Sequence, residues 1–406
     1  PNFFKIKSLN LIINLNTLLL ISLLPLTISE VKNYILITYL IIFISIYWKK
    51  IPSFFSKNYI LNIIFFFIIF FILTFNILYN LELEWHAQIY DYLKYLVFFQ
   101  DGVYSELNSY DWKKIGSSHF HPHFGQYLWA FFAKVSLISS ETYGRLFHLF
   151  LYCFSLICLI NQFITLKNTL KFISFILLIF LTYDYDFFSG TQEILIFSFL
   201  VLLSINIFNI YNKKEYTIDF YAYLLTSNLL IWIKAEGFVY ALILLLCIYF
   251  SPLLKKYKLI ALFSYVIFNL FKYIVFELNE FSSIPRPGLY TMDYILNLDL
   301  NLIILRIKLI ITWLIYYISV NEIWIICLIC MSLLILKIKD SNINYKFLYL
   351  FFMLDILFIF LSYIFHSIDT MGYIRATLSP EIFSTSGFFV ITIMIYVEQI
   401  LNIKTK

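Results

Sequence analysis

The chain has 406 residues, of which 62% are hydrophobic, 21% are aromatic and only 13% are charged, and its mean hydropathy is +0.86. Soluble domains carry about 25% charged residues, so this composition excludes a soluble enzyme or binding module and indicates a protein embedded in lipid. The net charge of +5 does not indicate nucleic-acid binding, because the basic residues are dispersed in short loops between apolar segments.

Twelve apolar segments approach the length of about 20 residues that a membrane-spanning helix needs. They are 9–29, 34–48, 59–80, 145–161, 169–183, 193–211, 219–233, 238–253, 259–276, 323–337, 346–365 and 382–401. The expected fold class is therefore all-α: a polytopic membrane helix bundle with about twelve transmembrane helices plus juxtamembrane helices, forming a single transmembrane domain over residues 1–406.

Two further apolar segments, 124–139 and 299–320, are expected to be interfacial or half-embedded helices that do not cross the membrane. Counting them as spans would break the alternation of lysine-rich loops that the positive-inside rule requires. The second segment also carries Arg306 and Lys308 near its middle, where charges are costly at bilayer depth and cheap at an interface.

The twelve-span interpretation places every lysine-rich loop on one side, which is the cytoplasmic side by the positive-inside rule. These loops contain Lys5/Lys7, Lys49/Lys50/Lys57, Lys167/Lys171, Lys213/Lys214, Lys255/Lys256/Lys258, Lys337/Lys339/Lys346 and Lys404/Lys406. We therefore expect a multi-pass protein of the cytoplasmic (inner) membrane of the cell envelope, with both termini cytoplasmic. All six histidines lie in or beside the opposite, external or periplasmic face, so chemistry is expected there.

The first external loop, 81–144, opens with four carboxylates just outside the third span: Glu82, Glu84, Asp91 and Asp101. A carboxylate held at the membrane edge can act as a general base towards a hydroxyl. The alternative is a solvated acidic loop without a chemical role.

Further along this loop, His119, His121 and His123 alternate around Pro122. In an extended chain this spacing points the three imidazoles the same way, which suits a divalent metal, a phosphate or a sugar hydroxyl. The alternative is a polar turn that leads into an amphipathic helix. No other cofactor is indicated.

Three later external segments carry further candidates. Glu193 follows Gly190 at a helix start, where a carboxylate can simply stabilise the helix N-terminus. Lys234 and Glu236 occupy a break between two apolar segments, as a structural ion pair or a functional one. Arg375 is the only arginine of the last external segment, and its guanidinium suits a lipid phosphate.

These motifs, in this order, resemble the GT-C superfamily of integral-membrane glycosyltransferases, of the dolichyl-phosphate-mannose mannosyltransferase-like and aminoarabinose transferase-like kinds. The positions that match are Trp85, Ala87, Lys94, Asp101 and Gly102 in the first external loop, then His121-Pro122, Arg145-Leu146, Gly190 with Glu193, and Lys234 with Glu236 and Gly237. The resemblance covers residues 60–250 and rests on the ordered set of motifs. One position departs from the pattern, since His86 stands where the family carries its catalytic aspartate.

The resemblance implies an inverting transfer of a hexose or pentose from a polyprenyl-phosphate donor to an acceptor hydroxyl of a glycan, lipid or protein outside the membrane. It implies Glu84 as the base with His86 second, Lys234 and Arg375 as ligands of the phosphate, and Lys94, His121, His123, Glu193 and Glu236 as further substrate-binding residues. The departure leaves three readings open: Glu84 has replaced the aspartate, His86 serves as base, or the activity is lost.

Two other function classes stay open. A lipid-linked polysaccharide polymerase or ligase also has many spans, but it usually carries its large external loop in the second half of the chain, whereas this loop follows the third span. A non-enzymatic transporter or flippase is expected to show charged or broken helices at the bilayer midplane and an internal repeat, and the sequence indicates neither.

Overall fold

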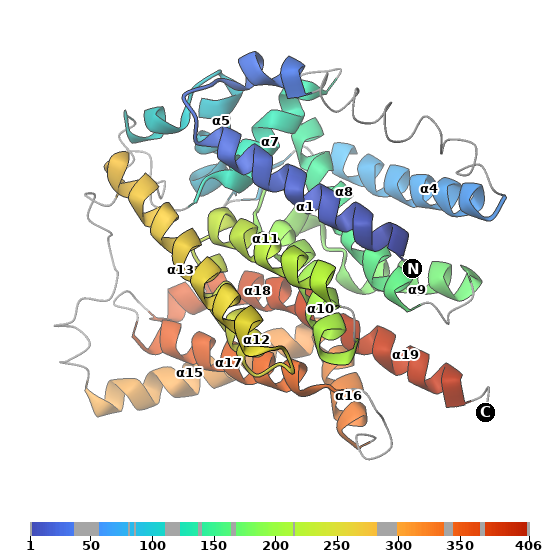
Figure 1. Ribbon diagram of the computed structural model, residues 1–406. Helices are drawn as coiled ribbons and strands as arrows, with labels where there is room; N and C mark the ends of the chain where they lie inside the picture. The colour runs from blue at the N-terminus through green and yellow to red at the C-terminus, as the bar shows by residue number, and fades with distance from the viewer. Residues whose placement is uncertain are drawn as a thin grey trace. The chain divides into compact units, whose positions relative to one another are not determined.

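The computed structural model describes residues 2–35, 57–79, 82–84, 87–109, 122–136, 140–163, 168–213, 216–281, 299–336, 344–365 and 370–403. Figure 1 shows the helices that these ranges form. Within them the chain contains fifteen α-helices, three short π or 3₁₀ segments and no strand. The prediction of an all-α fold is confirmed.

The chain divides into two compact units, and each is described by itself. We call residues 1–16, 155–182 and 195–406 the bundle unit, and residues 17–154 and 183–194 the loop unit. The boundaries fall inside three helices: α1 (Asn2–Ser22), α8 (Glu141–Gln162) and α10 (Glu193–Asn212).

The remaining helices each belong to one unit. The loop unit contains α4 (Lys57–Tyr79), α5 (Tyr92–Phe99) and α7 (Phe124–Val135), together with the short segments Ala87–Asp91, Tyr104–Ser109 and Tyr185–Phe188. The bundle unit contains α9 (Asn168–Thr182), α11 (Thr217–Ile233), α12 (Gly237–Tyr249), α13 (Lys255–Leu278), α15 (Leu300–Val320), α16 (Glu322–Leu336), α17 (Lys346–Ile364), α18 (Thr370–Phe389) and α19 (Ile391–Ile403).

Six helical stretches of the described residues are long and apolar enough to cross a membrane. They are Glu141–Gln162, Glu193–Asn212, Lys255–Leu278, Leu300–Val320, Lys346–Ile364 and Thr377–Ile400, and shorter apolar helices cover Phe66–Tyr79, Thr169–Thr182, Thr217–Ile233, Gly237–Tyr249 and Glu322–Leu334. All of these except Leu300–Val320 overlap segments predicted as spans. The chain is therefore a membrane protein.

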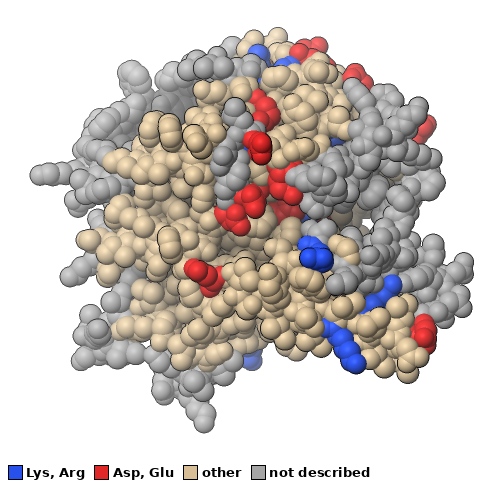
Figure 2. All heavy atoms as spheres, turned by 180° about the vertical axis from the view of Figure 1, so that it is seen from behind, with Lys and Arg blue, Asp and Glu red and all other residues tan. Residues whose placement is uncertain are grey.

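The burial of these helices separates those that face lipid from those that form the core. The apolar stretch of α10 is 100% buried, whereas that of α13 is only 11% buried. A helix that is apolar all round and buried belongs in a core, while the exposed leucines and phenylalanines of α13, such as Phe263, suit contact with lipid tails. In the space-filling view of Figure 2, most of the described surface is neither acidic nor basic.

Segment 299–320, which was expected not to cross the membrane, forms α15, and its 21 residues are long and apolar enough to cross. Arg306, which argued against a span, is only 5% exposed. Its guanidinium Nη1 donates a hydrogen bond of 2.5 Å to the carbonyl of Ile364 at the end of α17. The charge therefore has a polar partner within the bundle unit, which lowers the cost of burying it.

Other predicted boundaries differ in smaller ways. Helix α7 has 12 residues, about 18 Å at 1.5 Å per residue, which is shorter than a bilayer core of about 30 Å. Residues 137–139 lie outside the described residues, so the statement that 124–139 does not cross stays a prediction. The first predicted span, 9–29, ends early because α1 stops at Ser22, just before Pro25. The last one is divided at Val390 between α18 and α19. Most of predicted span 34–48 lies outside the described residues.

Candidate functional site

The predicted site residues fall into both units. Glu84, Lys94, His123 and Glu193 belong to the loop unit, and Lys234, Glu236 and Arg375 belong to the bundle unit. His86 and His121 lie outside the described residues, as do Trp85 and His119.

Glu84 lies where the first external loop meets a segment one hundred residues further along. Its backbone N–H donates to the carbonyl of Ser189 at 3.0 Å, and its half-buried carboxylate accepts a hydrogen bond from the Ala87 N–H at 3.3 Å. A carboxylate that accepts a hydrogen bond from the first turn of a helical segment is held in place by it. The proposed base is thus fixed at the start of the Ala87–Asp91 segment.

Gly190 explains why these two segments can approach each other. Its φ of +100° is a conformation that favours glycine. A Cβ at this position would lie 2.8 Å from Cη2 of Trp129 on α7 and 3.1 Å from the Cβ of Ala87. The Gly190 motif therefore has a packing role, and it brings the loop before α5, the turn before α10 and helix α7 together in the loop unit.

Lys94 is enclosed by this arrangement. Its side chain on α5 is 1% exposed, and burial lowers the pKa of its amine to about 7, against the opposing attraction of Asp91. The Asp91 carboxylate accepts a hydrogen bond from Gln126 of α7. An amine with this pKa can gain or lose a proton near neutral pH, so Lys94 is chemically unusual as well as structurally placed.

His123 is equally buried, at 1% exposure. Its Nε2 lies 3.0 Å from the Ser22 hydroxyl, and its ring packs against those of Tyr104 and Phe98, with centroid separations of 4.2 and 5.8 Å. Among the described residues no group of three or more His, Cys, Asp or Glu side chains could hold a metal ion. His119 and His121 lie outside those residues, so the predicted metal site is not tested.

The Asp101-Gly102 step of the family resemblance also has a structural role here. Asp101 has φ of 66°, and its carboxylate accepts hydrogen bonds from the N–H and hydroxyl of Ser29, at 3.1 and 2.9 Å, and pairs with Lys134. Although burial acts in the opposite direction, the hydrogen bonds from Lys134 and Ser29 hold the pKa of Asp101 below its usual range. This carboxylate links the end of α5 to the end of α7.

In the bundle unit, Lys234 and Glu236 lie between α11 and α12. The Lys234 Nζ is 3.6 Å from the Glu236 Oε1, and both side chains are partly exposed. Both interact electrostatically with Glu381 of α18, which accepts a hydrogen bond of 3.1 Å from the Tyr363 hydroxyl. The structure therefore brings the Lys234 motif and the last predicted external segment together.

Arg375 itself lies six residues before Glu381 on α18. Its side chain is exposed, with the guanidinium carbon 5.2 Å from the ring centroid of Trp313 on α15. At about 100° per residue, positions six apart point in different directions from the helix axis. Within the bundle unit, Glu381 is thus the residue of this segment that interacts with Lys234.

The sequence analysis missed two buried carboxylates, Glu381 and Asp355. They are 6% and 1% exposed and interact electrostatically with each other. Glu381 is the last residue before predicted span 382–401, and Asp355 is a single carboxylate inside predicted span 346–365. An ionisable residue within a span is itself a functional signal, so Asp355 could have been found from the sequence.

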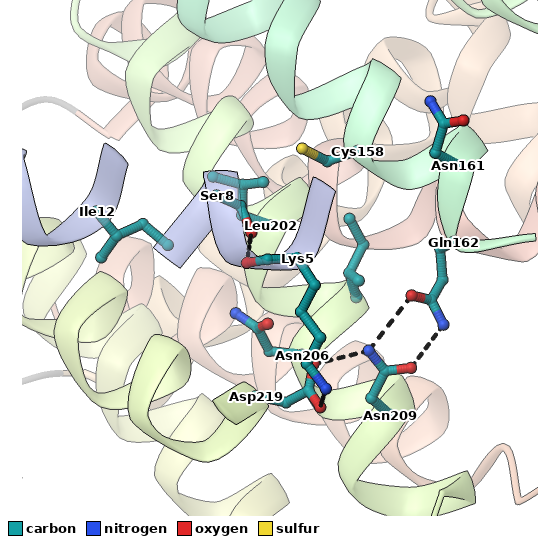
Figure 3. Close-up of a pocket in the computed structure, with 11 residues that line it drawn as sticks. Lys5, Ser8, Ile12, Cys158, Asn161, Gln162, Leu202, Asn206, Asn209 and Asp219 are labelled. Carbon is teal, nitrogen blue, oxygen red and sulfur yellow. Dashed lines mark hydrogen bonds and ion pairs between the residues drawn. The ribbon is translucent and has the colours of Figure 1, made fainter. Parts of the chain in front are cut away.

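A polar cavity in the bundle unit lies between α1, α8, α10 and α11 (Figure 3). Lys5 pairs with Asp219 at 2.5 Å, and the Asn209 amide donates to the other oxygen of Asp219 at 2.8 Å. Gln162 in turn donates to the Asn209 side-chain oxygen at 2.6 Å. These lining groups bond mainly to one another, which indicates a structural network.

No family model, curated protein or solved structure matches the chain. The support for the candidate sites therefore comes from the sequence and from the geometry within each unit.

Proposed function

We propose that the chain is an inverting integral-membrane glycosyltransferase, which moves a sugar from a polyprenyl-phosphate donor to an acceptor hydroxyl on the external face of the inner membrane. The observation that carries the proposal is the hydrogen bond between Glu84 and Ser189 beside Gly190. This hydrogen bond joins two motifs of the family pattern that are a hundred residues apart. Gly190 also packs against Trp129 of α7, in the same unit as Lys94. A GT-C-like bundle of about twelve spans with cytoplasmic termini belongs to the same proposal.

In the proposed reaction, the acceptor oxygen attacks the anomeric carbon, and the phosphate of the carrier leaves with the bonding electron pair. The acceptor proton passes to the Glu84 carboxylate. Lys234 and Arg375 bind the departing phosphate, which needs compensating positive charge. His121, His123, Glu193 and Glu236 shape the sugar site, and membrane lipid surrounds the carrier chain.

The direction of α1 and α11 supports the topology in this proposal. Lys5 contacts Asp219, and Asn16 contacts Asn228, so the two helices run in the same direction. In the lysine-based topology both pass from the cytoplasm outward. An antiparallel arrangement would have contradicted that topology.

The first test identifies the donor and the base together. We expect deletion of the gene to cause a lipid-linked sugar to accumulate, and the purified full-length protein to transfer that extracted sugar in vitro. Glu84→Gln is expected to abolish transfer and retain donor binding, because the amide cannot accept the proton. His86→Asn is expected to retain measurable activity.

Glu82→Gln is the matched control, since Glu82 is an exposed carboxylate two residues from Glu84. If Glu84→Gln stays active while His86→Asn is inactive, His86 is the base. If no lipid-linked sugar accumulates and neither variant changes any transfer, the glycosyltransferase proposal is wrong.

One observation favours a second candidate, a transporter or flippase: Asp355 and Glu381 are buried in helices long enough to span. Ionisable residues inside spans are frequent in transporters. Reconstituted vesicles distinguish the two, since a transporter moves lipid-linked substrate across the bilayer without any new glycosidic bond, whereas a transferase makes the bond.

A further inference from the structure

The bundle unit contains a buried carboxylate that has no hydrogen-bond partner among the described residues. Asp355 lies in the middle of α17, is 1% exposed, and neither of its carboxylate oxygens accepts a hydrogen bond there. The hydroxyl of Thr385 is near enough to interact with it, but that hydroxyl donates to the carbonyl of Ile382 at 3.3 Å. An ionised carboxylate in this position is strongly disfavoured.

The charges around Asp355 do not balance if every group is ionised. Glu381 interacts electrostatically with Asp355, Glu236 and Lys234, so three carboxylates share one ammonium group. Burial of the excess negative charge requires bound protons or bound cations.

The two arginines on the packed helices interact with other groups. Arg306 of α15 donates to the Ile364 carbonyl, and Arg375 of α18 stacks on Trp313. Neither is among the groups that act on Asp355 or Glu381. Among the described residues, Lys234 is therefore the cation that acts on Glu381 and pairs with Glu236.

Two observations favour protons over a metal ion. Hard cations such as Ca²⁺ or Mg²⁺ need six or more oxygen ligands, and no acidic group of the described residues is arranged to hold a metal. The Tyr363 hydroxyl donates to Glu381 at 3.1 Å and lies 2.7 Å from the hydroxyl of Thr377. Linked hydroxyls of this kind can pass a proton from one oxygen to the next.

We propose that Asp355 and Glu381 form a proton-binding site inside the bundle unit, which exchanges protons with water through Tyr363, Thr377 and the Lys234–Glu236 pair. Each carboxylate binds one proton delivered by hydronium, which is left as water, and releases it to water by the same route. The partial exposure of Lys234 and Glu236 provides the outer end of this route. The proposal shares Lys234 and Glu236 with the proposed transfer site, but it does not require that the protein transfer a sugar.

Infrared spectroscopy of the full-length protein in lipid nanodiscs at neutral pH tests the site directly. We expect the C=O stretching bands of protonated carboxylic acids in the wild type. Asp355→Asn should remove one band and Glu381→Gln another, because each amide replaces a neutral acid of similar shape. Glu322→Gln, at an exposed glutamate, is the matched control and should leave both bands. Spectra that are unchanged in both buried-site variants would overturn the proposal.

Two further measurements keep the test decisive if a variant does not fold. In D₂O, Tyr363→Phe is expected to slow the hydrogen–deuterium shift of the Glu381 band several-fold, because the relaying hydroxyl is removed. The wild-type thermal midpoint should not depend on Na⁺, K⁺, Mg²⁺ or Ca²⁺ at constant ionic strength. A cation-specific rise in that midpoint, absent in Glu381→Gln, would show that a metal ion occupies the site instead. Loss of sugar transfer in any variant has no bearing on these spectra.

Discussion

The burial of Lys94, in the loop unit, should change how the stability of the protein depends on pH. Burial lowers the pKa of its amine to about 7 in the folded protein, whereas an unfolded lysine titrates near 10.4. Between about pH 7 and pH 10 the unfolded chain therefore binds more protons, and the stability rises with pH. Below pH 7 both states are protonated, so the cost of burial is constant there.

The Lys94→Met variant is expected to lack this rise, because methionine does not titrate. The measurement is the thermal midpoint in detergent at several pH values from 7 to 9, for the wild type and the variant. Lys308→Met, at an exposed lysine, is the control and should follow the wild type. Parallel curves for the wild type and Lys94→Met would show that the amine is not buried in the functional protein.

The sequence predicted the residue types of the candidate site better than it predicted their hydrogen-bond partners. Glu84 and Lys94 were identified as reactive types in the first external loop, but the Ser189 carbonyl that fixes Glu84 comes from a distant segment. The same is true of Ser22, which meets His123 across 101 residues. Local spacing carries no information about such partners.

At the scale of elements, Gly190 controls the contact between the first external loop and the turn before α10. We expect Gly190→Ala to destabilise the protein by about 1–3 kcal/mol, because alanine is strained at a positive φ and its Cβ would press on Trp129. The measurement is the denaturation midpoint in detergent. Gly372→Ala, at an exposed position in α18, should be neutral or slightly stabilising. Equal behaviour of the two variants would contradict the packing role of Gly190.

The apolar periodicity located helices well and their ends less well. Helix α1 stops at Ser22, three residues before Pro25. Leu24, which precedes the proline, is disfavoured in helical geometry, whereas the predicted first span ran past Pro25. Segment 299–320 was excluded as a span because it would break the alternation of lysine-rich loops and because it carries Arg306 and Lys308. In the structure Arg306 has a partner on another helix, the Ile364 carbonyl. The cost of a charge in a span depends on such partners, which the sequence does not show.

At the scale of the whole molecule, the pairing of Lys5 with Asp219 joins α1 to a helix near the middle of the sequence. Asp219 is 1% exposed, so Lys5→Met would leave a buried charge without its cation and should cost about 3–5 kcal/mol. Asp219→Asn removes that charge and keeps an acceptor for Asn209. The double variant Lys5→Met/Asp219→Asn is therefore expected to be more stable than Lys5→Met alone. A double-mutant cycle in detergent measures the coupling, and strictly additive effects would contradict it.

The contacts of α1 with α11 also constrain the order in which the protein is assembled. Lys5 and Asn16 find their partners, Asp219, Leu225 and Asn228, between 209 and 214 residues later. During synthesis Lys5 and Asn16 therefore lack these interhelical partners until α11 has been made. A chain truncated before α11 is therefore expected to hold α1 less firmly than the full chain does, because the partners of Lys5 and Asn16 are then missing.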